Sequence, residues 1–292
     1  MSPRVAVLAG DGIGPEVIEA AVPLLGAGVE MVWLDAGADR YLTSGELLSS
    51  ADLAQIFDSD ALLFGAIGDP RVPDGILERG ILLRLRKELD LYVNLRPFPD
   101  LGLAIVRENT EGLYSGVGSS YGDIAVETSI NTVAAVTRCA RYAFELAAQR
   151  SGRLTLVHKT NVLVHAGPLW RGVVEGLRDE FSDVAVGYEH ADAAAYHLVT
   201  DASRFDVILT DNLFGDLLSD VAAGVAGGLG RAASANLHPD ARTRPSRCMG
   251  LFEPVHGSAP DIAGKGVADP SAARGAARLL VEALALEAVD QV

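Results

Sequence analysis

Short apolar runs alternate with longer amphipathic stretches along most of this 292-residue chain, and that alternation limits the folds open to it. Residues 4–9, 61–66, 103–107 and 205–210 are apolar runs of the length of buried strands. We expect further strands at 31–34, 154–157 and 184–188, and helices at 16–25, 50–57, 82–91, 130–149, 169–180, 191–198, 215–225 and 272–288. Strands that alternate with helices in this way predict an α/β fold with a largely parallel sheet.

The charge balance narrows the classes of partner. The chain has 24 Lys and Arg residues against 39 Asp and Glu residues, which gives a net charge of −15 at pH 7. So acidic a chain is not expected to bind nucleic acid or an anionic membrane as its main partner. A local group of arginines can still give one region of an acidic protein a positive potential, so the charge balance does not exclude a small anionic ligand.

Cysteine usage and hydropathy predict the compartment. Cys139 and Cys248 are the two cysteines, and they lie far apart with no metal-ligand spacing, so neither a disulfide scaffold nor a structural zinc site is expected. The sequence has no apolar run long enough for a membrane span, and its N-terminal segment turns polar too early for a signal peptide. We therefore expect a soluble, cytoplasmic protein of one or two domains.

Two glycine-rich segments are candidates for a dinucleotide site. The turn at 10–14 follows a predicted strand but lacks the GxGxxG spacing, and the GxGxxA match at 228–233 follows a predicted helix. A Rossmann fingerprint needs the strand, the glycine spacing and the helix in that order. The sequence therefore predicts no conventional Rossmann site.

Acidic residues on one predicted helix suggest a metal site. Asp216 and Asp220 are spaced i and i+4, so their carboxylates project from one helix face. Hard divalent cations such as Mg²⁺ or Mn²⁺ prefer such oxygen ligands. Asp192, a lone carboxylate in apolar surroundings, is a candidate third ligand. The alternatives are a solvated acidic face for the pair and a helix N-cap for Asp192.

Basic residues near the ends of predicted elements suggest an anionic substrate. Arg86, Arg96 and Arg107 are candidates, because an arginine can bind a carboxylate through paired hydrogen bonds. Arg84 and Lys87 have a simpler interpretation as partners of Glu88 and Asp90.

Proton-transfer groups and a rigid loop complete the candidates. Tyr114 follows a glycine turn, and Lys159 follows a predicted strand, although both residue types also occur for packing and solubility. The segment 252–266 combines two prolines and three glycines with polar residues, which predicts a fixed loop rather than a strand or helix. Within it, His256 and Asp261 could contact a ligand.

Taken together, the motifs resemble those of a known family. The segments LAGDGIGPE (8–16), NLRP (94–97), VRENTEG (106–112), HKTNV (158–162), NLFGDLLSD (212–220) and 253–264 occur in this order. They are similar to the isocitrate/isopropylmalate dehydrogenase family of β-decarboxylating dehydrogenases over nearly the whole chain. Within that family, 68–90 and 156–167 are most similar to the 3-isopropylmalate dehydrogenases.

The resemblance implies a two-domain architecture with a dinucleotide site outside the Rossmann plan. Residues 1–96 with 227–292 would form the cofactor-binding domain, and 97–226 the dimerisation and metal/substrate domain. An obligate homodimer would share each active site, with Lys159 and Asp192 reaching in from the partner subunit.

The resemblance also implies the roles of single residues. The malate carboxylates would be bound by Arg86, Arg96 and Arg107. The Mg²⁺ or Mn²⁺ ion would be bound by Asp192, Asp216 and Asp220. The catalytic residues would be Lys159 as the base, Tyr114 as the proton donor, and Asp192. The cofactor would be bound by His256, Gly257, Ser258, Ala259, Asp261, Ile262 and Asp269, and the Asp261 carboxylate would favour NAD over NADP.

An apolar segment before Arg86 indicates which substituent the substrate carries. Leu82 and Leu83 would contact an alkyl group and leave a third carboxylate unsolvated, which favours 3-isopropylmalate over isocitrate. Glu78 is a candidate acid near the nicotinamide, with the register there shifted by one residue. The alternative substrates are D-malate, homoisocitrate and another alkylmalate of a specialised pathway. If the chain is not an enzyme, the alternative is a non-catalytic regulatory subunit.

The chain also departs from the family pattern. Only ten residues separate Arg96 from Arg107, the segment 115–128 is short, and Asp269 stands where many relatives have asparagine. The given sequence stops at Val292, near where the family resemblance leads us to expect another C-terminal helix. The short segments could alter the substrate loop or the dimer contacts.

Overall fold

The computed structural model describes residues 2–289, which form two compact units. The first unit combines the described parts of Met1–Leu91 and Gly228–Val292, and the second is Tyr92–Gly227. Both consist of strands and helices in alternation, so the predicted α/β class with a largely parallel sheet is confirmed. The functions predicted for the two domains stay predictions.

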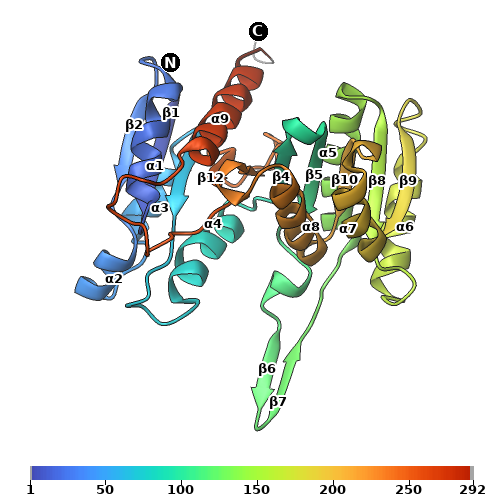
Figure 1. The fold of residues 1–292 in the computed structure, drawn as a ribbon, viewed down its shortest axis with the longest axis horizontal. Helices are drawn as coiled ribbons and strands as arrows, with labels where there is room; N and C mark the ends of the chain where they lie inside the picture. The colour runs from blue at the N-terminus through green and yellow to red at the C-terminus, as the bar shows by residue number, and fades with distance from the viewer. Residues whose placement is uncertain (1, 290–292) are drawn as a thin grey trace. The chain divides into compact units, whose positions relative to one another are not determined.

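The sheet of the first unit runs in the order β2-β1-β3-β12-β11 (Figure 1). Its strands are Arg4–Gly10 (β1), Glu30–Leu34 (β2), Ala61–Ala66 (β3), Ala233–Leu237 (β11) and Gly250–Pro254 (β12). The pairings are parallel except that of β11 with β12, which is antiparallel. Its helices are Gly14–Ala21 (α1), Ala38–Ser44 (α2), Ser50–Phe57 (α3), Leu83–Glu88 (α4) and Ser271–Val289 (α9).

Apolar side chains from the strands and from α3 and α4 form the core of this unit. Leu8, Ile56, Phe64, Leu85 and Leu251 are each at most 1% exposed. Because α4 contributes Leu85 to this core, the next residue, Arg86, is also buried, with 8% of its surface exposed.

The sheet of the second unit runs in the order β4-β5-β10-β8-β9. Its strands are Val93–Phe98 (β4), Leu103–Glu108 (β5), Arg153–His158 (β8), Ala185–His190 (β9) and Val207–Thr210 (β10). All pairings are parallel except that of β4 with β5. Its helices are Val133–Gln149 (α5), Ala166–Leu177 (α6), Ala191–Thr200 (α7) and Asn212–Val225 (α8). Because β5, β8 and β10 are parallel, their carboxyl ends meet at one edge of the sheet.

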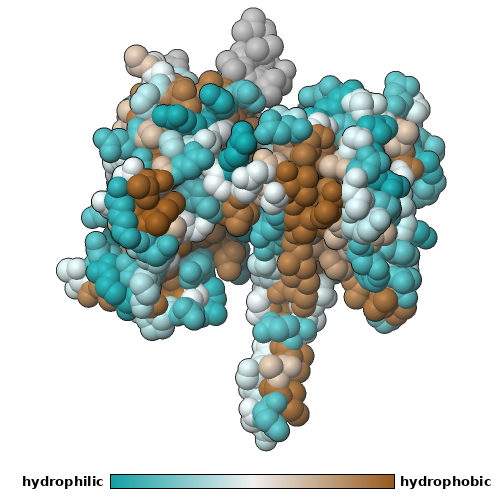
Figure 2. Space-filling view, viewed as in Figure 1, coloured by the Kyte–Doolittle hydropathy of each residue, from teal (hydrophilic) through white to brown (hydrophobic). Residues whose placement is uncertain are grey.

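A two-stranded hairpin projects from the second unit. Its strands are Gly118–Tyr121 (β6) and Ile124–Glu127 (β7), and every residue of both strands is exposed. The hairpin extends away from the sheet (Figure 1), and apolar side chains line it (Figure 2). Such a ribbon is at best marginally stable alone in water.

Several elements differ from the sequence prediction. The sequence did not predict the strands β4, β6, β7 and β11 or the helix α2. The predicted loop 252–266 was wrong at its start, because the strand β12 continues to Pro254. The predicted helix 215–225 begins earlier, at Asn212, because the Asp211 side chain accepts a hydrogen bond from the amide of Phe214 and caps it. The predicted strand 61–66 and helix 50–57 are present with the predicted ends, and the other predicted elements are present with shifted ends. No helix within residues 2–289 has the length and apolar character needed to cross a bilayer.

Candidate active site

Two of the predicted substrate arginines meet at one carboxylate in the second unit. Arg96 on β4 is 6% exposed and Arg107 on β5 is 1% exposed. Arg96 Nη2 lies 3.2 Å and Arg107 Nη1 2.5 Å from Oδ1 of Asp216 on α8. The antiparallel pairing of β4 with β5 brings the two guanidinium groups to this point. The structure therefore joins these three predicted residues in one cluster.

Neutral side chains hold both arginines in place. Asn94 Oδ1 accepts from Arg96 Nε at 3.0 Å, and Ser219 Oγ lies 2.5 Å from Arg96 Nη1. Asn212 Oδ1 accepts from Nε and Nη2 of Arg107 at 2.9 and 2.7 Å. Amide and hydroxyl oxygens fix the orientation of a guanidinium without adding negative charge, so Asp216 is the carboxylate that both arginines share.

These supporting residues were missed from the sequence. Asn94 and Asn212 lie inside the motifs quoted for the family resemblance, and an amide next to an arginine motif was the available signal. Asn212 is separated from Arg107 by 105 positions, so only the fold brings them together.

Tyr114 and the two aspartates of α8 belong to the same cluster. Tyr114 Oη donates to Asp216 Oδ2 at 2.7 Å, and its ring lies 5.1 Å from the guanidinium of Arg107. Burial, and to a lesser degree the Asp216 carboxylate, raise the pKa of Asp220, although Arg96 acts in the opposite direction. Two carboxylates one helical turn apart, with this unfavourable charge between them, fit a hard divalent cation.

Lys159 and Asp192 form a separate pair. Lys159 follows β8, Asp192 lies in the first turn of α7, and Nζ and Oδ1 are 2.6 Å apart. The hydrogen bond from Lys159 lowers the pKa of Asp192. The alternative of an N-cap role for Asp192 is wrong, because His190 holds that position.

The predicted metal ligands are not brought together within one chain. Over the described part of the chain, no group of three His, Cys, Asp or Glu residues has the geometry of a metal site. Asp216 and Asp220 share α8, whereas Asp192 is paired with Lys159. A complete three-carboxylate site would need a third carboxylate beside Asp216 and Asp220.

A buried His-Asp pair lies beneath the cluster. His158 is fully buried, and its Nε2 lies 3.7 Å from Oδ2 of Asp211, the N-cap of α8. Burial raises the pKa of Asp211 to about 6 and lowers the pKa of His158 to about 4. The charge of Glu108 raises the pKa of Asp211 further, and the charge of Arg107 lowers it. The sequence indicated no such pairing.

These two shifts predict how stability depends on pH. The folded-state pKa of Asp211 lies above its ordinary value of 3.8, so this group makes the free energy of unfolding fall as pH rises from about 4 to 6. His158 has the opposite effect between about pH 4 and 6.5. Asp211→Asn removes the first contribution and keeps a good N-cap. We expect its free energy of unfolding to rise more steeply with pH than that of the wild type over this range.

The measurement is urea unfolding across that pH range. Asp123→Asn changes an exposed residue between β6 and β7 and serves as the control, with the wild-type pH slope expected. An Asp211→Asn variant with an unchanged slope would show that the pair does not titrate as described.

Arg86 is held in the first unit by a buried ion pair. Its Nη2 lies 2.9 Å from Oε1 of Glu253 on β12, and both side chains are at most 10% exposed. Asn236 Nδ2 donates to the same oxygen at 2.8 Å. Arg86 Nε is buried without a hydrogen-bond partner. Arg84, by contrast, pairs with Glu88 at 3.6 Å, as its simpler interpretation predicted.

The two predicted specificity residues differ in their surroundings. Leu82 is half-buried and packs against the core of the first unit, whereas Leu83 is half-buried outside that core cluster. The convergence of Arg86 with the arginine pair of the second unit stays a prediction.

The glycine-rich turn after β1 supports the predicted cofactor loop. Gly12 has φ +58°, and a Cβ there would lie 2.0 Å from the carbonyl oxygen of Ser258. The amide of Ile13 donates to that carbonyl at 2.8 Å, and the amide of Gly264 donates to Glu16 Oε1 at 2.6 Å. The start of α1 thus fixes the loop at both ends, and only glycine permits the close approach at residue 12.

Polar groups of that loop fit a dinucleotide. His256 Nδ1 lies 2.9 Å from the carbonyl of Gly257, and its Nε2 is buried without a partner. Asp261 is exposed, and Asp269 accepts a hydrogen bond from the amide of Ser271. The orphaned ring nitrogen offers a hydrogen-bonding position to a ligand, as an adenine would need. Gly257 is exposed, and Ala259, with φ +40°, and Ile262 are half-buried in the same loop.

A pocket of about 240 Å³ adjoins the same loop within the first unit. Ser258 and Pro260 line one part of it, and residues between Gly68 and Glu78 line the rest. Glu78, the candidate acid, therefore shares a pocket with Ser258, one of the predicted cofactor residues.

Comparisons with known proteins agree with the motif analysis. The model of the family "Isocitrate/isopropylmalate dehydrogenase" matches residues 4–291. A 3-isopropylmalate dehydrogenase of Mycobacterium leprae is 51% identical over 92% of this chain and 85% of its own length. One from Corynebacterium glutamicum is 52% identical over 96% of this chain and 88% of its own.

Solved structures agree as well. An isocitrate dehydrogenase from Methylococcus capsulatus superposes with a TM-score of 0.87 at 36% identity, covering 97% of this chain and 86% of its own. A β-decarboxylating dehydrogenase from Thermococcus kodakarensis superposes with a TM-score of 0.82 at 42% identity, covering 97% and 84%.

Proposed function

The chain belongs to the isocitrate/isopropylmalate dehydrogenase family and is a β-decarboxylating dehydrogenase, and we propose that its substrate is 3-isopropylmalate. It converts this substrate to 2-oxoisocaproate in leucine biosynthesis, with NAD and Mg²⁺ or Mn²⁺ as cofactors. The convergence of Arg96, Arg107 and Tyr114 on Asp216 carries this proposal, because it gathers anion-binding and proton-transfer groups beside candidate metal ligands.

The arginine pair accounts for the binding of a malate. Two guanidinium groups, which share the single carboxylate of Asp216 and are oriented by neutral side chains, have further N–H groups that can donate to the carboxylates of the substrate. Arg86, held by Glu253, is the third candidate donor. Leu83, half-buried outside the core cluster, is the better candidate of the two leucines for contact with the alkyl group, because Leu82 packs inward.

Proton transfer is assigned to two residues. A bound metal ion would lower the pKa of the substrate hydroxyl, and a bound nicotinamide would accept the hydride from the carbon that bears this hydroxyl. Lys159 takes the proton from the hydroxyl oxygen. Loss of CO₂ from the resulting β-keto acid leaves an enolate, and Tyr114 protonates its carbon. Asp216 keeps the Tyr114 hydroxyl in place through their 2.7 Å hydrogen bond.

A homodimer supplies the missing ligand and the base. Asp216 and Asp220 lie in one copy, and Asp192 with Lys159 would reach the site from the second copy. Exposed apolar side chains of the second unit support this assembly, since Tyr121, Ile124 and Leu217 are 84%, 59% and 58% exposed. Figure 2 shows apolar surface over α8 and along the hairpin. A second hairpin or helix face would cover it.

NAD rather than NADP is the proposed dinucleotide. The loop held by Gly12 and Glu16 carries His256, whose buried Nε2 has no hydrogen-bond partner, and the exposed carboxylate of Asp261. A carboxylate accepts hydrogen bonds from ribose hydroxyls and repels a 2′-phosphate.

The test is NADH formation with 3-isopropylmalate, D-malate, isocitrate and homoisocitrate in the presence of Mg²⁺. We expect a strong preference for 3-isopropylmalate, abolished by EDTA and restored by Mg²⁺ or Mn²⁺. Lys159→Met should lower kcat by about 10²–10⁴-fold, the usual contribution of a general base. Lys87→Met, an exposed lysine of α4, is the matched control with wild-type activity. Activity on none of the four acids, or full activity in EDTA, would refute the proposal.

A further inference from the structure

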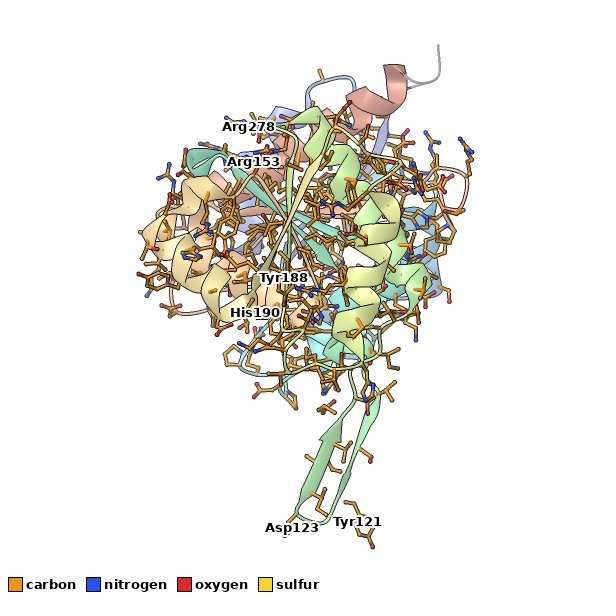
Figure 3. All side chains as sticks on the ribbon, turned by 90° about the vertical axis from the view of Figure 1, so that its right-hand side faces the viewer. Tyr121, Asp123, Arg153, Tyr188, His190 and Arg278 are labelled. Carbon is orange, nitrogen blue, oxygen red and sulfur yellow. The ribbon has the colours of Figure 1, made fainter. Side chains whose placement is uncertain are left out.

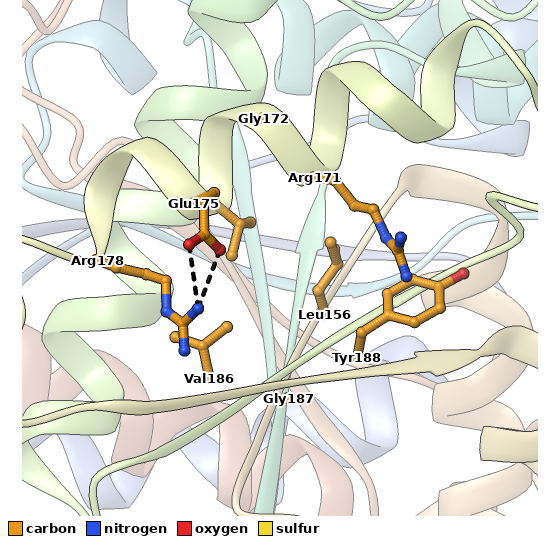
Figure 4. Close-up of a pocket in the computed structure, with 9 residues that line it drawn as sticks. Leu156, Arg171, Gly172, Glu175, Arg178, Val186, Gly187 and Tyr188 are labelled. Atoms are coloured by element: carbon orange, nitrogen blue, oxygen red, sulfur yellow. Dashed lines mark hydrogen bonds and ion pairs between the residues drawn. The ribbon is translucent and has the colours of Figure 1, made fainter.

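Tyr188, near the end of β9, is a tyrosine that the proposed reaction does not use. Its ring lies 4.1 Å from the guanidinium of Arg171 on α6, at the wall of an open pocket of about 440 Å³ (Figure 4). Leu156 and Val186 also line this pocket. A cation therefore covers one face of the half-buried ring.

The Tyr188 hydroxyl contacts the backbone on both sides of Lys159. It accepts hydrogen bonds from the amide and the hydroxyl of Thr160, at 3.1 and 2.9 Å. It donates to the carbonyl of His158 at 3.0 Å. One phenol oxygen thus bridges the residue before Lys159 and the residue after it.

The same hydroxyl also reaches the start of α7. His190 Nδ1 lies 2.7 Å from it, and the two rings stand perpendicular with their centroids 5.2 Å apart. Figure 3 labels the two residues next to each other. His190 is the N-cap of α7, and Asp192 in the first turn of that helix pairs with Lys159. The hydroxyl therefore lies between the two chain segments that carry Lys159 and Asp192.

We propose that Tyr188 is a positioning residue for Lys159, holding the Lys159–Asp192 pair in the geometry that proton transfer requires. This inference rests on the proposed function, in which Lys159 takes the substrate proton. A lysine side chain is long and flexible, so the direction of its stem depends on the backbone that carries it. Displacement by about 1 Å of a reacting group costs on the order of 10²-fold in rate.

Tyr188→Phe removes the bridging hydroxyl and keeps the ring beneath Arg171. We expect kcat to fall about 10- to 100-fold while the KM for NAD stays unchanged, because the proposed NAD contacts lie in the first unit. Thr160→Val, which removes one of the two donors, should change kcat in the same direction by less. Tyr41→Phe removes a hydroxyl from a partly buried tyrosine of the first unit and is the matched control, with wild-type kinetics expected.

A second readout does not depend on turnover. The chain has three lysines, Lys87, Lys159 and Lys265, so reductive ¹³C-methylation gives few signals and each can be assigned by substitution. At one fixed pH, the chemical shift of the Lys159 signal should differ between the wild type and Tyr188→Phe, whereas the signals of Lys87 and Lys265 should not move. A merely structural role of Tyr188 would not single out one lysine.

The two readouts separate this inference from the proposed function. If the wild type oxidises 3-isopropylmalate and Tyr188→Phe retains both its kcat and the chemical shift of its Lys159 signal, the positioning role is refuted and the proposed function stands. If the wild type acts on none of the four acids tested, the proposed function fails, and the chemical shift of the Lys159 signal alone decides whether Tyr188 controls the position of this amine.

Discussion

Replacing Gly215 with alanine should impair substrate binding severely, although alanine is the better helix former. Gly215 lies in α8, and a Cβ there would meet Cγ and Cβ of Arg107 at 2.6 and 2.7 Å. Carbon atoms do not approach this closely, so the arginine stem must move. Arg107 is 1% exposed and tied to Asn212 and Asp216, which leaves it no free direction.

The expected result is a rise of at least about tenfold in the KM for the malate, with a loss of about 1–3 kcal/mol in the free energy of unfolding from overpacking. Gly224→Ala in the same helix is the matched control, because Gly224 is exposed and a Cβ there would meet no atom within 4 Å. That variant should gain about 0.5–1 kcal/mol from helix propensity and keep its KM. Equal effects of the two substitutions would contradict the close packing of Arg107 against α8.

Removing the carboxylate of Glu253 should have the largest effect on stability. Glu253→Ala leaves the guanidinium of Arg86 buried without its charged partner and takes an acceptor from Asn236. Breaking a buried pair from one side costs about 3–5 kcal/mol. Glu253→Gln keeps a hydrogen-bond acceptor of the same shape and should lose less. The measurement is the free energy of unfolding in urea.

A surface pair provides the comparison for this experiment. Arg141 and Glu180 lie 2.7 Å apart, and their side chains are 42% and 54% exposed. Solvent screens such a pair, so Glu180→Ala should cause little change in stability. If Glu253→Ala is as stable as Glu180→Ala, Arg86 must find another partner or solvent when Glu253 is lost.

The strands that the sequence predicted correctly each lie in a continuous apolar run. The strands at 4–9 and 205–210 were found because strands buried on both faces are almost wholly apolar. The missed strands β4, β11 and β12 carry polar side chains, among them Asn94, Asn236 and Glu253, that are buried and paired in the structure. Residues that support the candidate site interrupt the apolar pattern, so the strands that carry them are the hardest to predict.

Chemical identity and local spacing were available from the sequence alone. The i, i+4 relation of Asp216 and Asp220 depends only on helix geometry, and the order of the motifs sufficed to indicate the family. The substrate arginines were also named from their positions in those motifs.

Only the tertiary structure decided which groups contact each other and in what environment. Arg107 is 105 positions from the Asn212 that orients it, and Arg86 is 167 positions from Glu253. The opposite pKa shifts of His158 and Asp211 arise from burial, which is a property of the packed units. The sequence determines the side-chain chemistry and local helix geometry; long-range pairing and desolvation depend on the whole fold, because both are set by atoms distant along the chain.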